Sequence, residues 1–272
     1  MKRGKVNAQV TIFVIVSILV VSGIGVSVYS YNKKLNSDFF NSPEIKPELD
    51  NVQGIVVSCS QEVSKEALEL IGFQGGYYER PENYFQYEEI FVPYYYDKGD
   101  FNIPLKKDIE NELSKYIEDN LLKCVENIAS SFDVYFGEVN ADVKIKDKEV
   151  IFNINFPVKI EKEDKSIVFE LKRHPISINS KLNGIYEIAD FIIKEHKDDI
   201  FICMTCISDM AQEKEVYVEM FSFDDNSTLF VIFDNRTESS DIYSYEFLTR
   251  YTGEELNDLK TEMPFLPDVP FV

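Results

Sequence analysis

One uncharged segment near the N-terminus constrains this 272-residue chain more than any other feature. Residues 10–31 contain no charged side chain, and three basic residues precede them while two follow. As an α-helix this segment would be about 33 Å long, enough to cross a hydrocarbon core of about 30 Å. The basic residues before it favour a cytoplasmic N-terminus. The sequence therefore predicts a cytoplasmic tip and single-pass anchor at 1–34, with residues 35–272 outside the cell.

The segment differs from an ordinary secretory signal, whose apolar region is about 7–15 residues long and ends at a small-residue cleavage site. The preceding stretch "GKVNAQVTIF" resembles the class III signals of archaeal pilin-like proteins, which implies cleavage between Ala8 and Gln9. Pilin-like subunits usually carry Glu at the fifth mature position, where this chain has Phe13, and Pro43 and Pro47 would interrupt a long stalk helix. Two alternatives remain: an uncleaved signal anchor, which we favour, and a processed pilin-like start.

The charge distribution indicates an outward-facing domain. Residues 1–34 carry five basic and no acidic side chains, so the remainder has 28 − 5 = 23 basic against 48 acidic residues, a net charge of −25. Such a chain repels nucleic acid and anionic headgroups, so we expect no nucleic-acid partner. Its abundant Phe and Tyr favour a packed core. Residues 35–46 have the composition of a juxtamembrane linker.

Residues 47–138 are predicted to be helical with a long tyrosine-rich connector. Apolar residues recur at three- and four-residue steps in two stripes, which predicts two helices. The first stripe is Val52, Val56, Cys59, Val63, Ala67 and Leu70, and the second is Ile109, Leu113, Ile117, Leu121, Cys124 and Ile128. Between them, "GGYYERPENYFQYEEIFVPYYYDKGDFNIP" is predicted to be an extended connection with little regular structure.

Residues 139–272 change to a period of two, which is typical of strands. "ADVKIKDKEVIFNINFPVKI" predicts a hairpin, "SIVFELKR" a further strand, and "EVYVEMFSF" with "TLFVIFDN" a second hairpin. "IYSYEFLTRY" is predicted to close the sheet, and helices are expected near 182–193 and 199–212. Helices packed on an antiparallel sheet define the α+β class, which is the predicted fold.

Three stretches resemble an uncharacterised family of membrane-anchored proteins from small-genome archaea. They are "VSCSQEVSKEALELIGFQGGYY", "VPYYYDKGDFNIPLKKDIENELSKYIEDNLLKC" and "YSYEFLTRY". The resemblance, which includes the "AQVTIF" start, implies an N-terminal anchor, an extracytoplasmic α+β domain and a cysteine pair in the first two helices. It implies no activity.

Four cysteines allow three disulfide connectivities. Cys59 and Cys124 lie on the two helical stripes, so antiparallel packing of those stripes predicts a disulfide between them in an oxidising compartment. Cys203 and Cys206 have C-x-x-C spacing, which we interpret as a structural disulfide or two buried thiols in a helix interior, with a redox pair as the alternative. The chain offers no second local pair of zinc ligands, so we expect no metal site.

The sequence offers no catalytic constellation. There are only two His residues, and the common hydrolase, nucleotide-binding and zinc-protease signatures are absent from the 272 residues. We therefore expect no catalytic residues and no cofactor.

The tyrosine-rich connector supplies the candidate binding residues Tyr77, Tyr78, Tyr94, Tyr95 and Tyr96. Tyr offers a large rigid surface with a polar tip, which suits a protein or glycan partner, although the same rings also serve as core. Asn226 and Asn235 begin sequons and are candidate glycosylation sites. Small residues within residues 22–27 of the anchor favour oligomerisation through close helix packing.

These features favour a membrane-anchored surface protein with a structural, adhesive or partner-binding role, of pilin-like type if the signal is processed. The alternative is a membrane-tethered thiol–disulfide redox enzyme that uses Cys203 and Cys206. The absence of a catalytic signature from the sequence favours the first.

The predicted topology has a direct test. Protease added to intact cells should digest residues 35–272, because the anchor, the acidic remainder and the sequons all place this region outside. Complete protection of the chain, while control surface proteins are cut, would contradict it.

Overall fold

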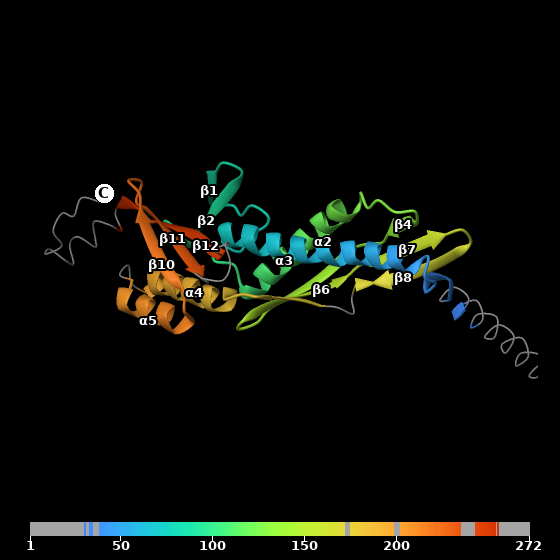
Figure 1. Ribbon diagram of the computed structural model, residues 1–272. Helices are drawn as coiled ribbons and strands as arrows, with labels where there is room; N and C mark the ends of the chain where they lie inside the picture. The colour runs from blue at the N-terminus through green and yellow to red at the C-terminus, as the bar shows by residue number, and fades with distance from the viewer. Residues whose placement is uncertain are drawn as a thin grey trace, which may run out of the picture. The chain divides into compact units, whose positions relative to one another are not determined.

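The computed structural model describes residues 30, 33–34, 38–171, 175–198, 202–234, 243–253 and 255 (Figure 1). Apart from Ser30, the predicted span lies outside these residues, as do the processing site Ala8–Gln9 and Asn235. Within the described ranges, no helix is long and apolar enough to cross a membrane.

The chain divides into two compact units that interleave along the sequence. Unit 1 comprises residues up to 55, 128–137 and 158–169, and unit 2 comprises 56–127, 138–157 and 170 onward.

The fold is α+β, with mainly antiparallel sheets and a few helices, as predicted. The long helices are α2 (Lys46–Phe73), α3 (Lys106–Val125), α4 (Leu182–Asp198) and α5 (Met204–Lys214). Both apolar stripes form helices, but the buried stripe of α3 continues from Leu121 to Val125, and Cys124 is exposed. Because a helix advances about 100° per residue, the fourth residue after Leu121 keeps to the buried face better than the third.

Unit 1 contains a three-stranded sheet in the order β4 (Asp133–Phe136), β7 (Pro157–Lys162), β8 (Lys165–Glu170). The Phe40 side chain is only 1% exposed, and its ring centroid lies 6.4 Å from that of Phe132. Phe40, which lies in the predicted juxtamembrane linker, therefore contributes to the core of this unit.

The largest sheet of unit 2 has six strands in the order β1 (Tyr84–Tyr87), β2 (Ile90–Asp97), β12 (Tyr243–Arg250), β11 (Ser227–Asp234), β10 (Tyr217–Ser222), with β3 (Asp100–Phe101) beside β2. Most pairings are antiparallel, but β2 runs parallel to β12. The expectation that the tyrosine-rich connector has little regular structure is therefore wrong, since it supplies β1, β2 and β3. Six consecutive residues of β2 are buried, so the strand shows no alternation that would have revealed it.

One face of this sheet carries an aromatic core. The ring of Phe247 stacks on Tyr95 at 4.6 Å and on Phe230 at 5.1 Å between centroids. The Tyr95 hydroxyl donates to the Gly75 carbonyl at 2.6 Å and lies 2.6 Å from the Tyr245 hydroxyl, which can donate to it in turn. Each hydroxyl therefore has a partner although both side chains are fully buried. Helices α4 and α5 lie along one side of these strands (Figure 1).

A second sheet of unit 2 has the order β5 (Asn140–Ile145), β6 (Glu149–Asn155), β9 (Ile176–Asn179), and β5 and β6 form the hairpin predicted from the sequence. Helix α3 packs along β5, and its side chains accept hydrogen bonds from every second backbone N–H of that strand. The pairs of helix acceptor and strand donor are Glu118 with Ala141 (2.9 Å), Ser114 with Val143 (3.2 Å) and Glu110 with Ile145 (3.0 Å). The helix thus satisfies edge donors that a neighbouring strand would otherwise bind.

The predicted Cys59–Cys124 disulfide is present, and its two Cα atoms are 5.8 Å apart. It joins α2 to α3 although Cys124 is exposed, because the bond lies at the margin of the buried stripe rather than in it.

Removing this disulfide should lower stability substantially. The bond closes a loop of 65 residues, for which chain entropy gives about 4 kcal/mol, so Cys59→Ala should shift the denaturant midpoint markedly downward. The matched control replaces both Cys203 and Cys206 by Ala, which opens a loop of only 3 residues worth about 2 kcal/mol. An equal or smaller loss for Cys59→Ala would contradict the prediction.

Candidate functional site

A groove of about 710 Å³ opens on the six-stranded sheet of unit 2. Its floor is a cluster of Val92, Tyr94 and Leu248, with Leu229 packed against it. Side chains alternate across each strand, so Leu248 and Tyr94 point to the groove while their neighbours Phe247 and Tyr95 point to the aromatic core. The sheet therefore uses one face for the core and the other for the groove.

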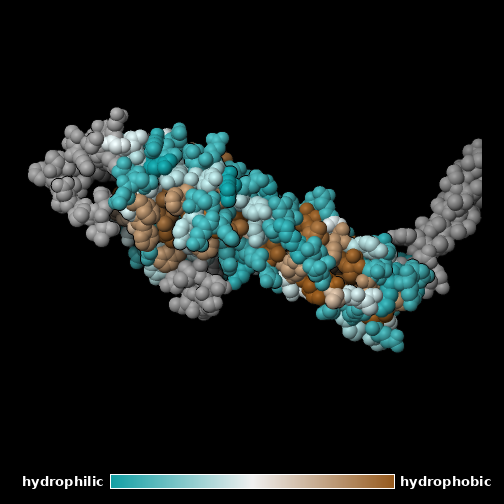
Figure 2. Space-filling view, turned by 90° about the horizontal axis from the view of Figure 1, so that it is seen from above, coloured by the Kyte–Doolittle hydropathy of each residue, from teal (hydrophilic) through white to brown (hydrophobic). Residues whose placement is uncertain are grey.

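Large aromatic side chains surround the groove and remain exposed. The exposed fractions are 37% for Phe73, 51% for Phe85, 58% for Tyr87 and 51% for Phe223. They come from the end of α2, from β1 and from the turn after β10. Figure 2 shows hydrophobic surface, in brown and tan, gathered at the left of the view over the part of the molecule that holds this sheet. Contiguous exposed apolar surface of this kind is typical of an interaction site.

The charged residues that line the groove are all acidic: Asp224, Asp225 and Glu246. Burial raises the pKa of the Glu246 carboxyl above its usual range, and a hydrogen bond from the Ser244 hydroxyl at 3.2 Å partly offsets this. An ionised carboxylate in this place is therefore short of compensating donors.

Arg250, which lies beside the groove floor, already has its partners. The Arg250 guanidinium donates to both oxygens of Asp97 at 2.8 and 2.9 Å and lies 4.3 Å from the centroid of the Tyr94 ring. This contact fixes β12 to β2 beneath the groove. Among the acidic groove residues, Asp225 accepts hydrogen bonds from the N–H and the hydroxyl of Ser227, and Asp224 is exposed.

Three of the predicted binding tyrosines are not surface residues. Tyr94, Tyr95 and Tyr96 are 4%, 0% and 6% exposed, because β2 lies inside the sheet between β1 and β12. Tyr95 and Tyr96 therefore pack inside the fold, as the core alternative expects, whereas Tyr94 forms part of the groove floor.

Tyr77 and Tyr78 are half-buried and hold the start of the connector against the fold. The Tyr77 hydroxyl donates to the Asn102 carbonyl at 2.8 Å. Burial raises the pKa of Tyr77 to about 12. The Tyr78 N–H donates to the Glu112 carboxylate at 2.8 Å. Neither residue lines the groove. Sequence reasoning missed Phe73 and Phe223 as site residues, since only the pairing of distant strands brings them together.

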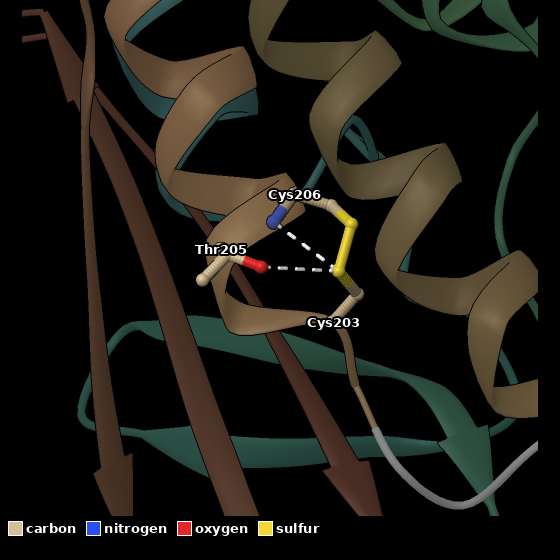
Figure 3. Close-up of a disulfide and its surroundings, with 3 residues drawn as sticks. All are labelled: Cys203, Thr205 and Cys206. Carbon is tan, nitrogen blue, oxygen red and sulfur yellow. Dashed lines mark hydrogen bonds between the residues drawn. A yellow bond between two sulfur atoms is a disulfide. The ribbon is translucent and has the colours of Figure 1, made fainter.

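The Cys203–Cys206 pair forms a disulfide with a Cα–Cα distance of 5.2 Å (Figure 3). Cys203 is the N-cap of α5, so the expectation that the pair lies in a helix interior is wrong. The Cys206 N–H donates to Cys203 Sγ at 3.3 Å, and Thr205 Oγ1 lies 3.5 Å from the same sulfur. The Cys203 sulfur therefore lies at the N-terminus of α5, where backbone N–H groups have no partner within the helix.

The other predicted sites add little chemistry. Asn226 is exposed in the turn between β10 and β11 with φ 65°, an accessible place for the first residue of a sequon. Among the residues that the structure describes, no group of three or more His, Cys, Asp or Glu side chains is arranged to hold a metal ion.

Comparison with known proteins identifies no relative: no family model, no curated protein and no solved structure matches the chain.

The half-buried carboxyl of Glu246 gives a pH-dependent prediction. Because its folded-state pKa is raised, its contribution to stability is present at low pH and is lost as pH rises through that pKa. Glu246→Gln should therefore raise the melting temperature at pH 7 more than at pH 3.5. Asp224→Asn removes the same charge from the exposed part of the groove and controls for net charge. Equal shifts at both pH values in Glu246→Gln would contradict the prediction.

Proposed function

We propose that this chain is a membrane-anchored surface protein that binds a protein partner through the aromatic groove of unit 2. The observation that carries the proposal is the ring of four exposed aromatic side chains around an apolar floor. Aromatic residues at the mouth of a concave apolar site contribute most of the affinity in many protein interfaces.

The chemistry of the groove defines the partner segment. Its floor accepts aliphatic or aromatic side chains, and its acidic residues favour an adjacent Lys or Arg. An ionised Glu246 destabilises the free protein, and a bound cation would compensate that carboxylate. The partner is therefore a segment with apolar side chains next to basic ones, a composition that also suits association with a chain of net charge −20.

The proposed location rests on the sequence. The uncharged segment at residues 10–31, the net charge of −25 beyond it and the sequons at Asn226 and Asn235 support an anchored chain with its folded region outside the cell. The resemblance to anchored archaeal surface proteins supports the same placement. Processing before Gln9 would make the protein pilin-like without changing the role of the groove.

The proposal can be tested with full-length protein in lipid nanodiscs and a displayed library of random peptides. Selected peptides should be enriched in aromatic or aliphatic residues beside Lys or Arg. Phe223→Ser should weaken their binding about tenfold or more, as expected for an interface anchor. Phe221→Ser is the matched control, because Phe221 is 48% exposed two residues away but does not line the groove.

Three outcomes would overturn the proposal. The first is a library with no enrichment, and the second is equal loss of binding in Phe221→Ser and Phe223→Ser. The third is binding of neutral oligosaccharides, but not peptides, that depends on Phe85 and Phe223, which would assign the groove to a glycan.

A further inference from the structure

We propose that Cys203 and Cys206 form a thiol–disulfide exchange site that accepts the electrons of exposed dithiols in other proteins. Cys203 provides the sulfur that the incoming thiolate attacks. This activity is separate from partner binding in the aromatic groove, and neither requires the other.

The start of α5 stabilises a thiolate at Cys203. The Cys206 N–H points at Cys203 Sγ from 3.3 Å and would donate to the thiolate when the disulfide opens. The Thr205 hydroxyl, 3.5 Å away, offers a second donor (Figure 3). Helix α5 has no acidic residue in its first turn, so its own first turn adds no negative charge beside Cys203. Amide donors at a helix N-terminus are a principal means by which proteins activate cysteine.

The surroundings of the pair allow a polypeptide to approach. Both cysteines are half-buried rather than enclosed, and Met204 beside them is 49% exposed. A groove of about 720 Å³ between α5 and β10 begins at Met204 and continues past Ile207 to Tyr217 and Met220. Its exposed apolar side chains suit an unfolded or extended segment that carries the dithiol.

The second disulfide of the chain provides an internal contrast. Cys59 lies in the interior of α2, where the backbone N–H groups are used within the helix, and its side chain is only 7% exposed. Its disulfide closes 65 residues, whereas Cys203–Cys206 closes 3. We therefore assign a structural role to Cys59–Cys124 and an exchange role to Cys203–Cys206.

The reaction proceeds in two displacements. A thiolate of the dithiol attacks Cys203 Sγ, the Cys203–Cys206 bond breaks, and Cys206 leaves as a thiolate that takes up a proton. The second thiolate of the dithiol then attacks the first sulfur of the dithiol, which is bonded to Cys203 in the mixed disulfide. Cys203 leaves as a thiolate that accepts the hydrogen bond of the Cys206 N–H. The dithiol loses two electrons and two protons and becomes a disulfide, while the chain's pair becomes reduced. Exchange with a second disulfide-bearing protein reverses these steps and restores the pair.

Two single-cysteine variants of the full-length protein in nanodiscs test which sulfur is activated. Cys206→Ser leaves Cys203 free, and Cys203→Ser leaves Cys206 free as the matched control. The rate of iodoacetamide alkylation is measured against pH. For Cys203 the pH at which the rate is half-maximal should be lower than about 8.5, the ordinary pKa of a free thiol. For Cys206 this midpoint should not be lowered. Identical profiles, or a lower midpoint for Cys206, would overturn the proposal.

A reduced dithiol peptide tests the reaction itself. Oxidised wild-type protein should convert the peptide to its disulfide in a one-to-one ratio. Cys206→Ser charged with glutathione at Cys203 should release glutathione and form a stable mixed disulfide with a matched peptide that carries a single thiol, and Cys203→Ser should not. Phe221→Ser, whose exposed side chain lines neither groove, should react like wild type and serves as the control.

A measurement on the unmodified chain keeps the proposal testable if a variant misfolds. Wild-type protein is equilibrated in glutathione buffers of graded potential, and its thiols are trapped and located by peptide mass spectrometry. Cys203–Cys206 should open while Cys59–Cys124 remains closed. Opening of both together, or of Cys59–Cys124 first, would overturn the proposal.

Discussion

Unit 2 depends on a short buried chain of hydrogen bonds that joins three distant parts of the sequence. The Tyr95 hydroxyl connects the Gly75 carbonyl after α2 to Tyr245 in β12. Burial without these partners would cost about 1–3 kcal/mol for each polar group, so the contacts specify where β2 lies as well as stabilising it. Gly75 has φ +53°, and a Cβ there would lie 2.5 Å from the Glu246 carbonyl oxygen, so glycine is required at this close approach.

The position of β2 also produces the groove. Once Tyr95 points to the aromatic core, alternation directs Val92 and Tyr94 to the opposite face. β1 then carries Phe85 and Tyr87 to the edge of that face by antiparallel pairing with β2. The same strand insertion therefore completes the core and creates an open apolar surface, which is why the stability of unit 2 and its proposed binding role rest on the same residues.

The sequence predicted those features whose signals are local. Helical stripes located α2 and α3, and alternation located the β5–β6 and β10–β11 hairpins, because each pattern lies within one or two adjacent elements. Strand β2 was missed because burial on both faces removes the alternation, and its parallel partner β12 is about 150 residues away in sequence, as the Asp97–Arg250 pair shows with a separation of 153. Phe73 and Phe223 were missed as groove residues because they lie outside the tyrosine-rich connector and reach the groove only through long-range strand pairing. The C-x-x-C spacing of Cys203 and Cys206 was recognised in the sequence, but the predicted helix began a few residues too early. The pair was therefore placed inside the helix, whereas Cys203 is its N-cap.

The contacts between α3 and β5 have a consequence for association between copies of the chain. Four residues of a helix advance about 6 Å and two residues of a strand about 6.6 Å, so acceptors at positions 110, 114 and 118 keep step with donors at 145, 143 and 141. Helix α3 thus takes the place of a neighbouring strand, and its side chains rather than its backbone accept the hydrogen bonds of β5. A second copy of the chain therefore finds this edge already occupied, and polymerisation by edge-to-edge strand addition is blocked there without a proline or a bulge.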